Sequence, residues 1–192
     1  PVFNEKKTIK KIIQKIKSIK SIKKQIILVD DGSNDGTKKI IKKELISKVD
    51  KVVFHKKNSG KGAAIISAKK FIKGDVVIIQ DADLEYDPDE YEKIINPIIN
   101  KKADVVFGSR FQGASPHRVV YFWHRVGNGF LTLMSNFFTD LNLSDMETCF
   151  KAFKSEIIKN IQIEENRFGF EPEITAKISK KDYRIYEVGI SY

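Results

Sequence analysis

Acidic residues follow two apolar segments of the chain, at the points where those segments end. A segment rich in branched apolar residues begins at Gln25 and ends in Asp30 and Asp31, and a second such segment ends in Asp81 and Asp83. Short runs of this kind are typical of buried strands. Ligands of open α/β sheets bind beyond the carboxyl ends of the strands. Single turn acids are common, but two clusters at equivalent strand ends predict one shared site.

The second cluster needs a compensating cation. Asp81, Asp83 and Glu85 alternate along a short run, and carboxylates gathered at a strand end repel one another. Mg2+ and Mn2+ prefer oxygen ligands and leave coordination positions for substrate phosphates. These three residues are therefore candidate metal ligands in an enzyme that acts on a diphosphate. Surface turn acids are the alternative, and the buried strand in front of them argues against it.

Other phosphate and nucleotide chemistries fit the residues less well. The stretch 58–63 lacks the Ser or Thr after its lysine, and the earlier glycine, that a nucleotide P-loop needs. A phosphatase of the haloacid dehalogenase type would have Thr or Val at the position of Glu85. No Gly-x-Gly-x-x-Gly follows the first strand, which argues against a dinucleotide oxidoreductase.

Alternating helices and strands are predicted to position these acids. Isoleucines at helical spacing, with lysines between them, predict an amphipathic helix from Ile9 to Ile19. Asp87, Pro88 and Glu90 have the residue types of a helix start. The expected strands are 25–29, 51–54, 75–80, 103–107 and 184–188, and the stretch 150–153 is expected to belong to the part of the chain that returns to the sheet. The expected helices are 35–46, 61–72, one beginning at 87, one or two within 117–143, and 173–179. This alternation predicts an α/β fold with a mostly parallel central sheet flanked by helices.

Length and composition predict one domain, residues 1–192. A chain of 192 residues with 41% hydrophobic content buries one substantial core. It opens at Pro1 without a methionine and ends at Tyr192 in a strand-like stretch, so we expect a fragment shortened at both ends. We find neither a signal peptide nor the roughly 20 consecutive apolar residues of a membrane span.

Net charge and cysteine content limit the possible binding partners and the cellular compartment only broadly. The 35 Lys and Arg and 25 Asp and Glu give a formal net charge of +10, which is compatible with nucleic acid, an anionic membrane or phosphorylated substrates. Most lysines are scattered as on a solvated surface, and we expect no nucleic acid partner. Cys149 is the only cysteine, so an intrachain disulfide is impossible and a reducing compartment fits best.

The order and spacing of the motifs resemble the family 2 glycosyltransferases, which have the GT-A (Rossmann-like) fold. The stretches that carry the resemblance are 1–5, 29–33 with 35–37, 58–62 and 81–83. Within the family, the dolichyl-phosphate and undecaprenyl-phosphate sugar synthases are the most similar, through the stretches 108–110, 145–153 and 167–171. The resemblance implies an inverting transfer of a hexose from a UDP- or GDP-sugar, dependent on Mg2+ or Mn2+.

The resemblance also implies which residues hold the nucleotide-sugar. Pro1, Asn4 or Glu5, and Asp31 correspond to nucleotide-binding positions of the family. Lys61 lies on a glycine-flanked loop from which it can approach the phosphates, and a solvated loop lysine is the ordinary alternative.

For the metal, the resemblance implies that Asp83 is a ligand and that Asp81 supports either the ribose or the metal. Glu85 is a further candidate ligand, although the synthases often carry Gln at that position. The three histidines lack metal-ligand spacing, so we expect structural or surface roles for them; they are His55, His117 and His124.

The nature of the acceptor decides which side chains the reaction needs. A sugar hydroxyl requires a general base, whereas a phosphate monoester has a second pKa near ~6 and needs cations to position it. We therefore assign Arg110 and Arg125 to an acceptor phosphate, with structural or surface ion pairing as the alternative. Asp145 is a candidate to orient the acceptor or to act as base, and Glu147 is a poorer one.

The stretch from Val119 to Phe138 combines aromatic side chains with arginines. Such a surface suits a membrane interface and a polyprenyl tail, with lysines attracting anionic headgroups; burial in the core is the alternative. The leading hypothesis is an enzyme that glycosylates a polyprenyl phosphate and lies peripherally on the cytoplasmic face of a membrane. A family 2 enzyme acting on a carbohydrate or glycolipid hydroxyl, and a noncatalytic nucleotide-binding or membrane-interaction module, are the alternatives.

Overall fold

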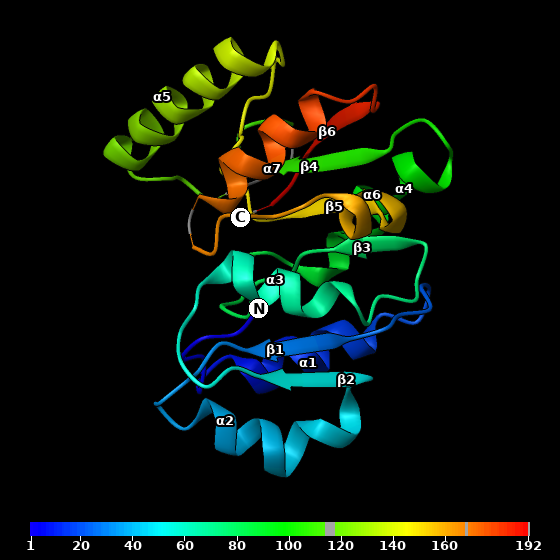
Figure 1. The fold of residues 1–192 in the computed structure, drawn as a ribbon, viewed down its shortest axis with the longest axis vertical. Helices are drawn as coiled ribbons and strands as arrows, with labels where there is room; N and C mark the ends of the chain where they lie inside the picture. Colours follow the sequence, from blue (N-terminus) through cyan, green and yellow to red (C-terminus); the bar gives the residue numbers. More distant parts are fainter. Residues whose placement is uncertain (114–117, 168, 192) are drawn as a thin grey trace.

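The computed structural model describes residues 1–113, 118–167 and 169–191, in which two sheets lie between helices (Figure 1). His117, one of the histidines considered above, and Phe168, in the stretch 167–171, lie outside the described residues. The first sheet contains β1 (Ile27–Asp30) and β2 (Lys51–Phe54). The second has the order β3-β5-β4-β6, formed by β3 (Val76–Ile78), β5 (Lys151–Lys154), β4 (Val105–Ser109) and β6 (Ile185–Gly189).

Strand direction agrees with the expected α/β class, with one departure. The pairs β1·β2 and β4·β6 are parallel, but β5 is antiparallel to both of its neighbours, β3 and β4. The connection from β4 to β5 contains α5 (Phe122–Thr139), but this helix stands away from the sheet and is not a crossover packed on it, the kind of connection that makes two strands parallel. The local sequence of a buried strand does not record its direction.

The predicted helices are present, and their ends differ by a few residues. They are α1 (Ile9–Ser18), α2 (Thr37–Ile40) continuing through a π turn η1 (Ile41–Leu45) and a 3-10 turn η2 (Ile46–Lys48), α3 (Lys61–Lys69), η3 (Pro88–Glu90), α4 (Tyr91–Ile99), α5 (Phe122–Thr139), α6 (Ser155–Asn160) and α7 (Phe170–Ser179). The Asp87 carboxylate accepts a hydrogen bond from Asp89 N at 3.1 Å and caps η3. The stretch 117–143 contains one helix, α5, and the short helix α6 was not predicted.

Helices cover the sheets through two apolar clusters. Ile9, Ile12 and Ile13 of α1 are buried together with Ile94 of α4. On the other side, α6 and α7 bury their isoleucines against β4 and β5. The isoleucine stripe of α1 therefore covers the sheet, as its spacing predicts.

Helix α5 stands apart from this packing. Figure 1 shows it at the edge of the molecule beside α7, and Thr132 is its one buried residue. Its large apolar side chains are exposed; they include Phe122, Trp123, Phe130, Phe137 and Phe138. Across the described ranges, no helix combines the length and the apolar character needed to cross a bilayer.

Candidate active site

Asp31 lies at the end of β1 and ties two loops together. Its buried carboxylate accepts hydrogen bonds from the backbone N–H groups of Ser59 (2.9 Å) and Gly60 (2.7 Å). His55 Nδ1 lies 2.6 Å from the same carboxylate, and His55 Nε2 lies 2.8 Å from Ser67 Oγ. His55 therefore links Asp31, a predicted nucleotide-binding residue, to Ser67 of α3, which is compatible with the structural or surface role expected for it. The neighbouring Asp30 is also buried, and its carboxylate oxygens have no hydrogen-bond partner among the described residues.

The opening segment of the chain is fastened to the loop that follows Asp31. Asn4 N donates to Ser33 Oγ at 2.9 Å, and Asn34 N donates to Asn4 Oδ1 at 2.9 Å. Asn4 has a φ of 57°, in the left-handed region that asparagine tolerates better than most residues. Asn4 therefore joins the opening segment of the chain to the loop after Asp31, and both belong to the predicted nucleotide site.

A chain of buried charges connects the second acidic cluster to the interior. Lys61 Nζ lies 3.1 Å from Asp81 Oδ2 and 2.8 Å from Glu171 Oε1. Glu171 Oε2 lies 2.5 Å from Lys151 Nζ, which is fully buried and also donates to Met146 O at 3.0 Å. Desolvation acts against the charged ammonium, but the charges of Glu171 and Asp81 prevail and raise the pKa of Lys61 well above its usual value. Lys61 is thus a fixed cation beside Asp81 rather than a solvated loop lysine.

Asp83 lies in a concentration of negative charge. Desolvation raises the pKa of its carboxyl group, and the charges of Asp81, Glu85 and Glu5 raise it further, against one hydrogen bond donated by Glu85 N at 3.0 Å. Asp81 and Asp31 both interact electrostatically with the amino group of Pro1. The acids that follow β1 and β3 therefore gather around the segment from Pro1 to Glu5. We call Asp31, Asp81, Asp83 and Lys61, which include the residues predicted to bind the nucleotide-sugar, the donor half of the candidate site.

The donor half has the ligand chemistry of a hard divalent cation. Asp81 and Asp83 offer carboxylate oxygens in a region of net negative charge, which a cation would offset. Among the described residues, no three His, Cys, Asp or Glu side chains are arranged as a ready-made metal site. Mg2+ is commonly held by one or two carboxylates together with substrate phosphates, so Asp81 and Asp83 remain candidate ligands for that mode. The structure does not test the expected ligand roles of Asp81, Asp83 and Glu85.

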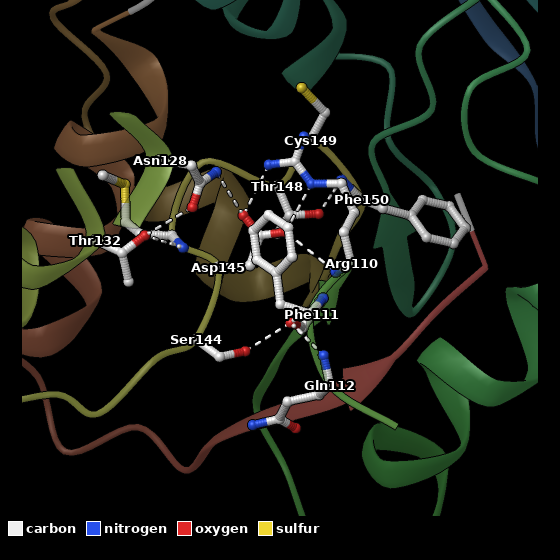
Figure 2. A network of polar contacts seen from close by, with 12 residues as sticks. Arg110, Phe111, Gln112, Asn128, Thr132, Ser144, Asp145, Thr148, Cys149 and Phe150 are labelled. Carbon is white, nitrogen blue, oxygen red and sulfur yellow. Dashed lines mark hydrogen bonds and ion pairs between the residues drawn. The ribbon is translucent and has the colours of Figure 1, made fainter. Parts of the chain in front are cut away.

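Arg110 and Asp145 form the centre of a second polar network (Figure 2). Arg110 Nε and Nη2 donate to the two oxygens of Asp145 at 2.7 and 2.8 Å, and Asn128 Nδ2 of α5 donates to Asp145 Oδ1 at 3.0 Å. Asp145 has no exposed surface, whereas the Arg110 side chain is 15% exposed. The bidentate pair fixes the guanidinium plane. Glu187 accepts from Asp145 N at 3.0 Å and holds the backbone of the same loop.

Phe111 brings the two predicted acceptor arginines together. The guanidinium carbon of Arg125 lies 3.6 Å from the centre of the Phe111 ring, and that of Arg110 lies 5.4 Å from it. Cations within about 6 Å of a ring centre are attracted to its face. Arg125 reaches this contact from α5 and Arg110 from the end of β4. We call Arg110, Arg125 and Asp145, which were predicted to bind or orient the acceptor, the acceptor half of the candidate site.

Several residues of the site carry no signal of their own in the sequence. Glu171, Asn128 and Phe111 complete the two networks from positions distant along the chain, and only the resemblance of the stretch 167–171 hinted at the first of them. Burial raises the pKa of the Cys149 thiol to about 12, and the nearby Asp81 charge adds to this, so the thiol stays protonated at neutral pH. His124 is exposed, and its ring contacts the Tyr121 ring edge to face, with the two ring centres 5.8 Å apart.

The chain matches the family model "Glycosyl transferase family 2" over residues 1–162. It is 29% identical to a UDP-N-acetylglucosamine–dolichyl-phosphate N-acetylglucosaminyltransferase of Methanococcus voltae, over 99% of this chain and 82% of that protein. It is 26% identical to a dolichol-phosphate mannosyltransferase of Pyrococcus furiosus, over 100% of this chain and 54% of that protein.

Solved structures agree on the fold. Glucosyl-3-phosphoglycerate synthase of Mycobacterium tuberculosis, in complex with Mn2+, uridine diphosphate and phosphoglyceric acid, superimposes with a TM-score of 0.78 at 18% identity. The match covers all of this chain and 66% of that one. At this level of identity the likeness concerns the fold alone.

Proposed function

The chain belongs to glycosyl transferase family 2, and from that premise we propose that it transfers a hexose from a UDP- or GDP-sugar to a polyprenyl phosphate such as dolichyl phosphate, with inversion at the anomeric carbon. Two relatives named above act on dolichyl phosphate, and one takes its sugar from a UDP-sugar. The single observation that supports this acceptor most is the meeting of Arg110 and Arg125 at Phe111, beside a helix with an exposed apolar surface.

The proposed reaction is a single displacement. An oxygen of the lipid phosphate attacks the anomeric carbon, and the bond from that carbon to the nucleotide diphosphate breaks. The acceptor is already largely dianionic at neutral pH, so its attack needs positioning and no general base. We assign this positioning to Arg110 and Arg125. Asp145, whose oxygens are engaged by Arg110 and Asn128, holds Arg110 in place in this proposal and does not act as base.

The donor half would stabilise the leaving diphosphate. We assign Asp83 and Asp81 to a divalent cation, which supplies Lewis-acid stabilisation of the departing oxygens when bound. Lys61 lies beside Asp81 and contributes a second positive charge near the leaving group. Asp31 and the segment from Pro1 to Glu5 hold the nucleotide. Fixed charges in a partly desolvated cleft act more strongly than the same charges in water.

We further propose that α5 rests on the cytoplasmic face of a membrane. Its exposed aromatic side chains suit the interfacial zone of a bilayer, and the net charge of +10 favours an anionic surface. The lipid phosphate would then reach Arg110 and Arg125 from the side of α5, while the nucleotide-sugar enters the donor half from water.

A transfer assay tests the proposal directly. The protein is incubated with Mn2+ and a panel of UDP- and GDP-sugars, with either polyprenyl phosphate or an oligosaccharide as acceptor. We expect transfer to the polyprenyl phosphate and loss of that transfer on chelation of the metal. Transfer to the oligosaccharide alone would replace the lipid acceptor by a carbohydrate hydroxyl, and absence of any transfer despite donor binding would indicate a noncatalytic module.

The membrane contact has its own test. The double variant Phe137→Ser/Phe138→Ser should lose sedimentation with vesicles of phosphatidylserine and phosphatidylcholine. Tyr186→Ser is the matched control, because Tyr186 is an exposed aromatic residue on β6. Equal sedimentation of the wild type, the double variant and Tyr186→Ser would show that α5 does not form the membrane contact.

A further inference from the structure

A lysine is buried on an interior strand of the second sheet. Lys151 lies on β5, between β3 and β4, and it is the one lysine or arginine that is buried among the described residues. Its ammonium group lies 4.9 Å from the centre of the Phe107 ring on β4. Burial of a charge is costly, and apolar replacement of a buried ion pair is often neutral or even stabilising. A contribution to stability therefore gives a poor account of this lysine.

The ammonium group of Lys151 holds the loop that leads into its own strand. It donates to Met146 O at 3.0 Å and also to Thr148 O. Buried carbonyl groups need such donors. The same loop begins with Asp145, whose carboxylate accepts two hydrogen bonds from the Arg110 side chain (Figure 2). Lys151 therefore fixes the backbone that carries Asp145 to Arg110 in the acceptor half.

On its other side, Lys151 is connected to the donor half through Glu171 of α7. Glu171 Oε2 lies 2.5 Å from Lys151 Nζ, and Glu171 Oε1 lies 2.8 Å from Lys61 Nζ. Lys61 Nζ in turn lies 3.1 Å from Asp81 Oδ2. The four charges alternate in sign along this chain, so Glu171 is the counter-charge of two lysines at once. Loss of Glu171 would leave those two lysines with one counter-charge fewer.

The segment that leads into α7 is packed directly on the loop that carries Lys61. A Cβ atom on Gly60 would overlap Asn166 O, and a Cβ atom on Gly62 would overlap Glu165 O. Glycine is the residue that permits backbones to approach this closely. The first turn of α7 and the loop around Lys61 are therefore held in a fixed relation, independently of the ion pair between them.

We propose that Lys151 and Glu171 are positioning residues that act on different halves of the site. Lys151 holds the acceptor half through the loop that begins at Asp145, and Glu171 holds the donor half through Lys61. This inference rests on the proposed function, which makes the two halves binding sites for two substrates. It follows that the two members of one ion pair affect different substrates when each is replaced, whereas a pair that serves stability alone affects neither substrate or both alike.

The variant Lys151→Met tests the acceptor side. It removes the donor to two loop carbonyl groups but leaves Glu171 paired with Lys61. We expect the KM for polyprenyl phosphate to rise about tenfold, because a small displacement of positioning groups is costly, and Mn2+-dependent nucleotide binding to stay within about threefold. Lys154→Met is the matched control on the same strand, since Lys154 pairs with Asp104 at a partly exposed position. Both constants of this control should match those of the wild type.

The variant Glu171→Gln should show the opposite division. Lys61 loses a counter-charge and is displaced, while Lys151 keeps its two carbonyl partners. We expect Mn2+-dependent binding of UDP or GDP, whichever the wild type binds, to weaken about tenfold, and the KM for polyprenyl phosphate to stay within about threefold. The double variant Lys151→Met/Glu171→Gln removes both buried charges, so it should be at least as stable as either single variant. It should nevertheless show both losses.

Amide hydrogen exchange measures the same division without any substrate. The N–H of Asp145 belongs to the loop held by Lys151, and the N–H of Gly60 belongs to the donor half. Lys151→Met should speed exchange at Asp145 about tenfold more than at Gly60, and Glu171→Gln should reverse that order.

These measurements separate the inference from the proposed function. Equal changes in donor affinity and acceptor KM in both single variants, or unchanged constants beside a lowered Tm, would show that the pair only stabilises the fold and would overturn the inference. A wild type that transfers no sugar to polyprenyl phosphate would contradict the proposed function instead. The exchange pattern would then still decide whether Lys151 and Glu171 hold separate parts of the molecule, because exchange at the same rate ratio in both variants would overturn that division.

Discussion

Two helices, α1 near the donor half and α5 at the acceptor half, differ in how far their apolar residues are buried. Beneath the donor half, Ile9 and Ile12 of α1 are 1% and 2% exposed, whereas Phe137 and Phe138 of α5 are 76% and 79% exposed. Both helices carry apolar residues at helical spacing. In α1 these residues form one stripe, which a sheet can cover, but in α5 they extend around the helix and its neighbour α7 covers one side. Apolar content alone therefore does not decide burial.

The largest expected effect comes from shortening one apolar side chain in each helix, which tests whether that helix is packed against the rest of the protein. Ile12→Ala should lower the free energy of unfolding by about 3 kcal/mol, because it leaves a cavity in the core. Phe137→Ala should change it by less than about 0.5 kcal/mol. Urea denaturation measures both, and similar losses would mean that α5 is packed in solution.

The next largest effect distinguishes the two halves by their ligands. Asp83→Asn should weaken Mn2+-dependent binding of the nucleotide-sugar on the order of 100-fold, because it removes a carboxylate ligand and its charge. Isothermal titration with and without Mn2+ measures this. Among the described residues, the hydrogen-bond and ring partners of Asp145 and Arg125 do not include Asp83, so the KM for the acceptor should stay within about twofold. A titration that matches the wild type would refute the assignment of Asp83 to the metal.

A smaller effect is expected in the acceptor half. Arg125→Ala should raise the KM for polyprenyl phosphate about tenfold and leave donor affinity unchanged, because Arg125 contacts Phe111 in the acceptor half. Arg118→Ala, which removes an exposed arginine, is the control. A fall in donor affinity with an unchanged acceptor KM would reverse the assignment.

The smallest effect concerns the carboxyl group of Asp83, whose neighbours Asp81, Glu85 and Glu5 are also acidic. Because the folded state raises the pKa of Asp83, ionisation of this carboxyl group costs stability above that pKa, and the cost vanishes below the unfolded value of about 3.9. Without metal, Asp83→Asn should therefore stabilise the protein at pH 7 by less than about 1 kcal/mol. The gain should disappear near pH 3.

Thermal unfolding across that pH range, with and without Mn2+, checks the sign. Added Mn2+ should stabilise the wild type and leave Asp83→Asn nearly unchanged. A variant that is less stable than the wild type at pH 7 without metal would contradict the proposed charge concentration.

Much of the donor half follows from local sequence. Asp31 and Asp81 directly follow apolar runs, and a run of that kind between helical segments is a buried strand whichever way the rest of the chain folds. Period and spacing likewise predict α1, whose isoleucines repeat with the helical turn. The start of η3 at Asp87, Pro88 and Glu90 can also be predicted from local sequence, because a helix cap involves only adjacent residues.

The rest required tertiary structure. Lys151 reads as a strand lysine, and its pairing with Glu171 arises because β5 and α7, distant in sequence, are packed together. Phe111 joins Arg110 to Arg125 for the same reason. Strand residue types carry no direction, so the antiparallel placement of β5 could not be foreseen. The sequence by itself identified candidate residues for binding a diphosphate and a cation, because that prediction depends on residue types and short spacings. Only the tertiary structure decided which charges neutralise one another and which apolar side chains stay exposed, because those depend on what the rest of the chain leaves uncovered.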